Sequence, residues 1–179
     1  MKTNISLICL LPNYGQTVAK ILAEKVDMFY ADVEDMFDFE LGDLEHILNV
    51  LGDKDGRKYI RETEAKVVKR ICSFENTLIS IRPETLFGNR NYDRIKKCSY
   101  IIYLQISPKF FKERSEFSKD CVDEKLVSLT FTEKDKLFVE KSDIIVNCSK
   151  LKEQKAIKKI ISSVSSFFRK QKKSQKKGE

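Results

Sequence analysis

The hydrophobic residues of this chain occur in two alternating patterns. Short, nearly continuous apolar runs rich in β-branched residues alternate with longer stretches in which apolar residues recur every three or four positions. The first pattern is typical of strands buried on both faces, and the second of amphipathic helices. The expected strands span residues 4–11, 76–81, 99–106 and 142–148, with a further strand at 27–32. The expected helices span residues 15–26, 43–52, 57–74, 91–98, 107–117 and 152–170.

This alternation predicts an α/β fold: a three-layer α/β/α sandwich around a mainly parallel, five-stranded sheet. The length of 179 residues suits one domain with its own hydrophobic core, which we place at residues 1–168. Residues 112–134 mix polar and apolar positions without a clear period, so we expect a lid-like segment there.

Composition narrows the class of protein. Hydrophobic residues make up 41% of the chain, too many for a disordered protein. No apolar run approaches the roughly 18 residues of a membrane-spanning helix, and the N-terminus lacks the features of a signal peptide. The five cysteines are scattered, with no CxxC spacing, which fits a reducing compartment better than a disulfide framework or a zinc site. We therefore expect a cytoplasmic protein.

The net charge of +7 is concentrated at the C-terminal end. Residues 169–179 (RKQKKSQKKGE) hold six Lys or Arg residues and one Glu, which leaves the rest of the chain nearly neutral. We expect a disordered, solvated Lys-rich tail. A weak contact of this tail with nucleic acid or an anionic membrane is an open alternative.

The stretch LLPNYGQT after the first expected strand stands where a phosphate-binding loop would lie. Such a loop uses glycines to aim backbone N–H groups at phosphates, a Lys to reach the outer phosphates, and a Ser or Thr to hold magnesium. Gly15 and Thr17 fit the second glycine and the hydroxyl, but Leu10 replaces the first glycine and Gln16 replaces the lysine. Taken alone, the stretch is better explained as an ordinary strand-to-helix turn.

The residues that follow resemble the shikimate kinase family, which are small-molecule kinases of the P-loop NTPase fold. The family's F-x-D-T-D-x-x-I-E and G-E-x-x-F-R-x-x-E motifs find partial matches, in order and at comparable spacing. The matching residues are 30–34, Phe37, Asp38, Gly42, Gly56, Ile60, Arg61 and Glu64. Residues 99–107 and 134–147 are similar to two later segments of the family. The resemblance covers about residues 4–165 and implies a substrate-binding subregion at about 32–64.

The resemblance also implies roles for single residues. Asp32 matches the acidic residue beside the magnesium and the reacting hydroxyl, so it is the candidate catalytic residue. Glu34 replaces an Asp that binds shikimate hydroxyls, and Arg61 matches an arginine that grips the shikimate carboxylate. Lys134 replaces an arginine near the substrate. Surface ion pairs are an equally good reading of the two acids and Arg61.

If the site works, ATP and Mg²⁺ are the implied cofactors. Gly15, Gln16 and Thr17 would then lie at the nucleotide, and Thr17 and Asp32 at the metal. Several catalytic features of the family are missing, however. Its glycine triplet corresponds to Arg82-Pro83-Glu84, and its lid arginine has no convincing counterpart, although Arg114 lies nearby.

Arg82 has two alternative roles. It follows a strand expected to neighbour the first one, so its guanidinium could replace the missing lysine and hold a phosphate. It could instead plug the empty pocket by pairing with Asp32 or Glu84. We favour the plug, because Pro83 and Glu84 add bulk and negative charge beside it.

The sequence thus favours a degenerate, catalytically inactive member of this family, a pseudokinase that acts by binding a protein partner or ligand. The alternative is a divergent active shikimate kinase, or a related small-molecule kinase, that uses ATP to phosphorylate an alcohol group. A weaker third class is a nucleic-acid or membrane-surface binder that works through the tail.

Overall fold

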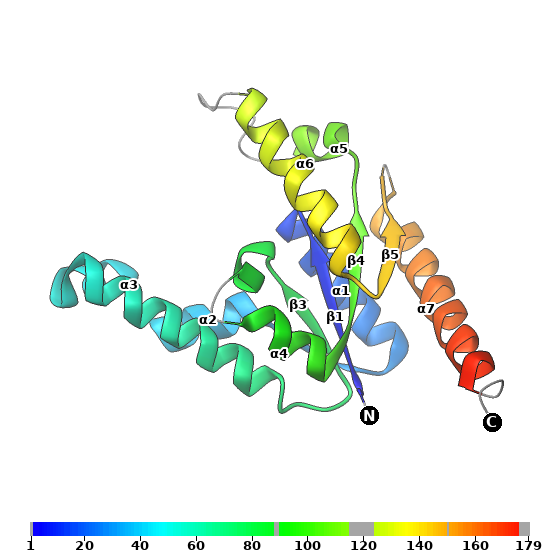
Figure 1. Ribbon diagram of the computed structural model, residues 1–179, viewed down its shortest axis with the longest axis horizontal. Coiled ribbons are helices and arrows are strands. Elements are labelled where there is room, and N and C mark those ends of the chain that lie inside the picture. The colour runs from blue at the N-terminus through cyan, green and yellow to red at the C-terminus, as the bar shows by residue number, and fades with distance from the viewer. Residues whose placement is uncertain (1, 88–89, 115–123, 150, 176–179) are drawn as a thin grey trace.

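Five parallel strands form a single sheet in the order β2-β3-β1-β4-β5. Their bounds are β1 Asn4–Cys9, β2 Phe29–Asp32, β3 Thr77–Ile81, β4 Ser99–Gln105 and β5 Ile144–Asn147. The computed structural model, shown in Figure 1, describes residues 2–87, 90–114, 124–149 and 151–175. All five predicted strands are confirmed, including the fifth at 27–32, and so is the three-layer α/β/α architecture.

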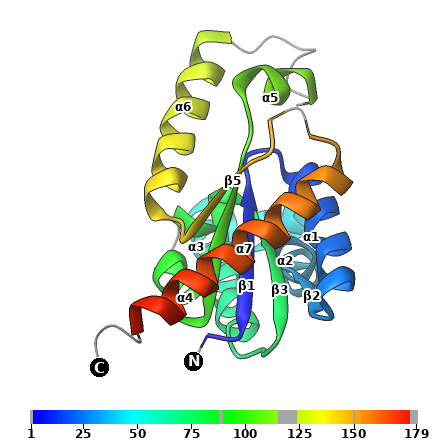
Figure 2. The same cartoon turned by 90° about the vertical axis from the view of Figure 1, so that its right-hand side faces the viewer.

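Helices cover both faces of the sheet (Figure 2). Their bounds are α1 Pro12–Val26, α2 Val33–Leu41, α3 Leu44–Ile71, α4 Asn91–Cys98, α5 Pro108–Arg114, α6 Glu124–Lys141 and α7 Glu153–Gln175, with a 3₁₀ turn, η1, at Pro83–Phe87. α1 and α7 pack together on one side of the sheet, and α4 and α6 lie on the other. This arrangement follows from right-handed crossovers between neighbouring parallel strands.

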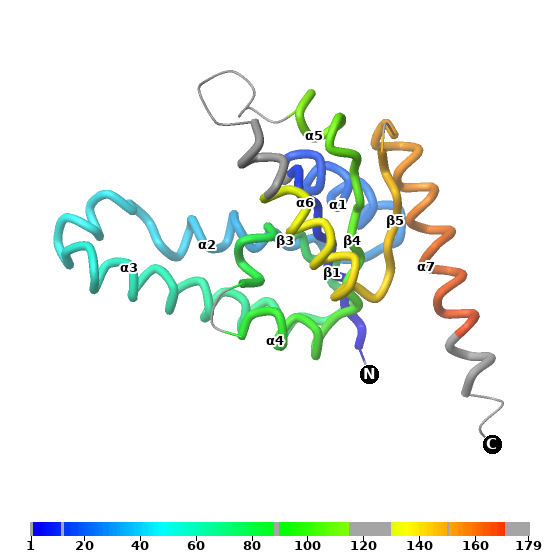
Figure 3. The backbone as a smooth tube through the Cα atoms, turned by 45° about the horizontal axis from the view of Figure 1, so that its top comes forward, coloured from blue at the N-terminus to red at the C-terminus, as the bar shows by residue number. Residues whose placement is uncertain are grey.

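An arm made of α2 and the first half of α3 projects away from the sheet (Figures 1 and 3). Asp32 and Asp43 cap the two helices, each accepting hydrogen bonds from backbone N–H groups of the following turn. Gly52, with φ of 75° and ψ of 166°, interrupts α3 between the two helices predicted there. The sequence pattern missed α2, because this short helix buries only Val33 and Leu41 and so shows no apolar period.

Two other predictions meet a different outcome. α7 continues to Gln175, so the expectation of a disordered tail is wrong for residues 169–175. Lys and Gln are good helix formers, which allows the helix to extend beyond its apolar face. Part of the expected lid lies in α6, whereas residues 115–123 lie outside the described residues. None of the helices in the described ranges is both long and apolar enough to cross a membrane.

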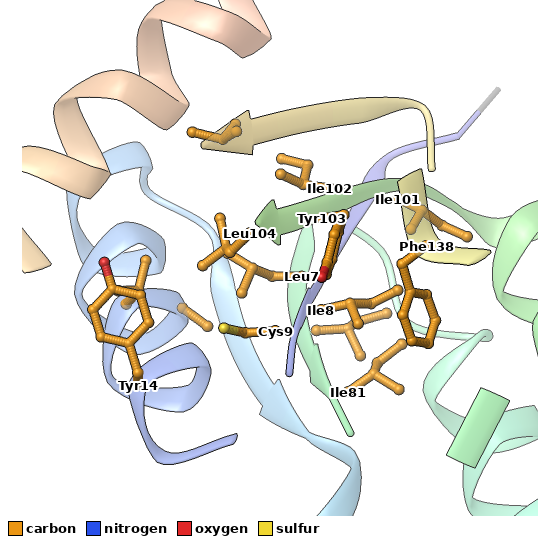
Figure 4. Close-up of a cluster of buried hydrophobic side chains, with 14 of the residues drawn as sticks. Leu7, Ile8, Cys9, Tyr14, Ile81, Ile101, Ile102, Tyr103, Leu104 and Phe138 are labelled. Carbon is orange, nitrogen blue, oxygen red and sulfur yellow. The ribbon is translucent and has the colours of Figure 1, made fainter. Parts of the chain in front are cut away.

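The core lies on both faces of β1 and β4. Tyr103, Leu104 and Ile8 are fully buried there, and Phe138 of α6 closes the cluster from one side (Figure 4). Continuous apolar strands were expected for this reason: each central strand is covered by a helix layer on either face.

A buried asparagine joins the amino-terminal ends of two neighbouring strands. Asn4 donates from Nδ2 to the Phe74 carbonyl oxygen at 2.6 Å and accepts from the Thr77 N–H at Oδ1, at 3.0 Å. Its side chain therefore satisfies two backbone groups where β3 begins, and an apolar side chain there would leave both without a partner.

We predict that Asn4→Ala lowers the free energy of unfolding by about 2–3 kcal/mol, because it leaves a buried donor and a buried acceptor without hydrogen-bond partners. Urea denaturation of the purified chain measures the change. Asn49→Ala is the matched control, since Asn49 is exposed on α3 and its loss should shift stability by less than about 0.5 kcal/mol. Equal losses in the two variants would contradict the role assigned to Asn4.

Candidate functional site

The carboxyl ends of β1, β2 and β3 meet at one edge of the sheet, where ligands bind in open α/β folds. Each strand is followed by one polar residue of interest: Gln16 in α1, Glu34 in α2, and Arg82 directly after β3. These three side chains come together although they are far apart in the sequence. They form the centre of the candidate site.

Glu34 is the shared acceptor of this cluster. Its Oε1 lies 2.7 Å from Arg82 Nη1, and its Oε2 lies 3.5 Å from Gln16 Nε2. Burial raises the pKa of Glu34, and the Arg82 charge opposes that rise. Gln16 stands at the position expected for a phosphate-binding lysine, and its side chain points toward the Glu34 carboxylate.

The expected partners of Arg82 were wrong. We predicted a pairing with Asp32 or Glu84, but the partner is Glu34. Asp32 is occupied as a helix cap: its Oδ1 accepts from the N–H groups of Glu34 and Asp35, at 2.8 and 3.2 Å. Its Oδ2 accepts from the Tyr30 hydroxyl at 3.0 Å, so both oxygens of this buried carboxylate are engaged.

Glu84 pairs elsewhere, since Lys134 Nζ of α6 lies 2.6 Å from its Oε1. Burial would raise the pKa of Glu84, but the hydrogen bond and charge of Lys134 outweigh it, and the pKa is lowered. Lys134 therefore does reach this edge of the sheet, where it binds an acid of the chain itself. Glu64 also lies here, and burial raises its pKa against the opposing effects of Thr85 and Arg82.

α1 begins early, directly after the first strand. Leu11 is its N-cap residue and Pro12 its first residue, so only Leu10 and Leu11 separate β1 from the helix. The N–H of Gly15 donates to the Leu11 carbonyl oxygen at 3.0 Å, an ordinary helical bond. Pro12 has no N–H. In the first turn of α1, the N–H groups of Asn13 and Tyr14 therefore have no helical acceptor.

Gly15 is needed here for close packing. A Cβ atom on Gly15 would lie 2.9 Å from Cys9 Cβ, because the first turn of α1 rests against the end of β1. Leu10 and Leu11 point into the core and are each 7% exposed. Thr17 is exposed, and its hydroxyl donates to the Asn13 carbonyl oxygen at 2.8 Å.

Tyr14 belongs to a second cluster of side chains beside the first turn of α1 (Figure 4 labels Tyr14 and Cys9). Its hydroxyl donates to the Leu151 carbonyl oxygen at 3.1 Å, and its ring meets Phe110 edge-on with centroids 5.5 Å apart. The Arg114 guanidinium lies 4.9 Å from the Phe110 ring centroid, and its Nη1 lies 3.4 Å from Glu153 Oε1. Arg114 is therefore held by α5 and α7.

The sequence reasoning did not foresee this second cluster. The spacing of Phe110 and Arg114, four residues apart on a helix, was a usable signal that they share a face. Their contact with Tyr14 and Glu153 depends on tertiary packing and produces no local pattern in the sequence.

Arg61 is an exposed residue of α3, three positions before Glu64. Its implied grip on a carboxylate stays a prediction, as does a catalytic role for Asp32. Within the described ranges, no three His, Cys, Asp or Glu side chains gather closely enough to hold a metal ion.

We predict that Gly15→Ala destabilises the chain by about 1–2 kcal/mol, because the new methyl group overpacks Cys9. Helix propensity alone would make the same change stabilising by about 1 kcal/mol, so the sign is diagnostic. Gly56→Ala is the matched control in α3: its close neighbour at 2.8 Å is the flexible end of Leu48, which can move aside. Thermal or urea unfolding of both variants measures the change in stability. A stabilised Gly15→Ala variant would refute the packing role of Gly15.

Comparison with known proteins places the chain in a family. The family model for shikimate kinase matches residues 16–165, beginning just after Gly15. Among curated proteins, shikimate kinase of Sulfurihydrogenibium sp. (strain YO3AOP1) is 26% identical over 117 residues, which are 65% of this chain and 69% of that protein. Shikimate kinase of Caldicellulosiruptor saccharolyticus is 27% identical over 113 residues, 62% of this chain and 63% of that protein.

Solved structures agree on the fold. Shikimate kinase from Aquifex aeolicus superposes with a TM-score of 0.74 at 21% identity, covering 91% of this chain and 96% of that one. Shikimate kinase from Acinetobacter baumannii, in complex with shikimate, gives a TM-score of 0.75 at 18% identity, covering 93% and 94%. Because the family model matches most of the chain, this protein belongs to the shikimate kinase family.

Proposed function

We propose that this chain is a catalytically inactive member of the shikimate kinase family, a cytoplasmic protein that acts by binding a partner. One observation carries the proposal: the place of the phosphate cradle is filled by the chain itself. α1 starts at Pro12, and Gln16 and Arg82 both turn to Glu34. A degenerate phosphate loop of this kind supports the fold without offering a nucleotide site.

The charges near this edge of the sheet support the same conclusion. Arg82 acts electrostatically on Glu34, Glu64 and Glu84, and Lys134 neutralises the last of these. Arg82 and Lys134 thus already face three carboxylates of the chain itself. A nucleotide phosphate brought here would meet excess negative charge, because both cations already have acidic partners.

The residues present do not fit a magnesium–nucleotide complex. The Gly15 N–H is used inside α1, and both Asp32 oxygens accept hydrogen bonds from the protein. Thr17 is exposed, but its hydroxyl donates to the Asn13 carbonyl oxygen, and one hydroxyl does not make a metal site. We therefore derive no phosphoryl-transfer step for this chain.

The expected rate penalty is large. Phosphoryl transfer depends on positioning and on neutralising the developing charge, and loss of one preorganised donor costs about 10²–10³-fold in rate. Here the lysine is replaced by Gln16, and Arg114, the arginine nearest to the lid, is stacked on Phe110. Two such losses would reduce a kinase to a trace activity.

A protein is the class of partner that the surface favours. Half of the ten large hydrophobic residues exposed in the described ranges lie on the arm between residues 39 and 59. They are Phe39, Leu44, Val50, Leu51 and Tyr59, and Phe39 is 87% exposed. Clusters of exposed apolar side chains on soluble folds commonly mark protein contacts.

We predict that titration with millimolar Mg-ATP, and then with shikimate, gives no saturable heat in isothermal calorimetry and no phosphorylated shikimate in a direct transfer assay. The A. aeolicus or A. baumannii enzyme serves as a positive control. Saturable binding of both ligands together with phosphoryl transfer would overturn the proposal and establish the divergent active kinase in its place.

We further predict that Arg82→Ala either shows no Mg-ATP binding, as expected for the unsubstituted chain, or gains binding, because Arg82 occupies the site through Glu34. Arg70→Ala is the matched control: Arg70 also pairs with an acid of α2, Glu40, but does so away from the strand ends. If the unsubstituted chain binds Mg-ATP after all, a tenfold or greater loss of affinity in Arg82→Ala, but not in Arg70→Ala, identifies Arg82 as the substitute for the missing lysine.

A further inference from the structure

Two cysteines that are far apart in the sequence meet at the amino-terminal edge of the sheet. Cys72 is the C-cap residue of α3, and Cys98 is the last residue of α4, just before β4. Their sulfur atoms lie 2.7 Å apart, only somewhat beyond the ~2.05 Å of a covalent S–S bond. Both side chains are half-buried, whereas Cys9 and Cys148 are fully enclosed.

The surroundings of the pair favour one thiolate. The hydrogen bond that Cys98 shares with Cys72 lowers the pKa of Cys98 most, against the effect of burial, and Ser99 and the Lys2 charge add to the lowering. The same shared proton, together with burial, raises the pKa of Cys72, with Arg94 as an opposing charge. The lowered pKa of Cys98 favours it as the attacking thiol, and the 2.7 Å separation of the two sulfur atoms places Cys72 to resolve a mixed disulfide formed there.

We propose that Cys72 and Cys98 form a reversible disulfide by exchange with a small-molecule disulfide. The Cys98 thiolate attacks one sulfur of that disulfide, which forms a mixed disulfide and releases one small thiolate. Cys72 then loses its proton and attacks the Cys98 sulfur, which forms the intramolecular bond and releases the second small thiolate. The two cysteines are oxidised by two electrons and the small disulfide is reduced by two, so the exchange balances.

This cross-link would restrain the C-terminal end of α3, the helix whose first half belongs to the arm. It ties the end of α3 to the start of β4 and closes a covalent loop that contains β3, η1 and Arg82. The same two helices wall an open hollow of about 550 Å³. The hollow is lined by Glu62, Ala65, Lys66, Lys69, Arg90 and Arg94. Oxidation would fix the C-terminal end of α3 and the walls of this hollow.

In the reducing compartment expected from the sequence, the pair would stay reduced until the pool of small disulfides rises. The site then acts as a redox-dependent clamp between the end of α3 and the start of β4. This inference does not depend on the proposed loss of catalysis, because neither cysteine belongs to the cluster around Glu34.

The test is to incubate the reduced, full-length chain with graded ratios of oxidised to reduced glutathione, block free thiols by alkylation, and map the peptides by mass. We expect a peptide in which Cys72 is joined to Cys98 to dominate. We also expect a rise of about 10 °C in the melting temperature, reversed by dithiothreitol, since the bond closes a loop in the unfolded chain.

Cys72→Ser should accumulate a glutathione adduct at Cys98 and show no rise in melting temperature. Cys148→Ser is the matched control and should retain the cross-link, as Cys148 is buried elsewhere. Full alkylation of Cys72 and Cys98 after oxidation of the native chain would overturn the proposal. So would a glutathione adduct at Cys98 that persists while Cys72 is present, or linkages in which Cys121 predominates. The peptide map of the unsubstituted chain decides the question even if a variant fails to fold.

Discussion

The contact between the first turn of α1 and the end of β1 governs the rest of the candidate site. The helix approaches the strand so closely that a Cβ on Gly15 would lie 2.9 Å from Cys9 Cβ. In the function proposed above, this approach takes up the space in which a looped backbone would curve around a phosphate. It also sets the direction of two neighbouring side chains: Tyr14 enters the core, and Gln16 turns to Glu34.

The cations near the candidate site are paired with acids of the chain itself. Phosphate sites work because backbone dipoles and cations converge on a space left for the ligand. Here the cations converge on acids of the chain: Arg82 on Glu34, Lys134 on Glu84, and Arg114 on Glu153. Each pair is at least partly solvated, so each contributes little stability, but together they leave a phosphate little positive charge to bind.

The two ends of the sheet carry different features. The carboxyl ends of the strands hold the family's reaction site in altered form, whereas the amino-terminal edge carries the Cys72–Cys98 pair, close to where Asn4 joins β1 to β3. The arm begins beside Glu34, where α2 starts, and the second half of α3 runs from the arm to Cys72.

The sequence by itself determined the fold class, all five strands and the family, because buried parallel strands are continuous in apolar residues and the family's motifs keep their order. It also singled out Arg82 as a residue of interest at the end of β3, and its role as a plug stays a prediction. Only the tertiary structure decided which acid Arg82 meets, that Tyr14 and Arg114 share a cluster, and that Cys72 lies beside Cys98. These pairings join residues from separate elements, and side-chain contacts across a sheet edge depend on crossover geometry, which leaves no periodic signal in the chain.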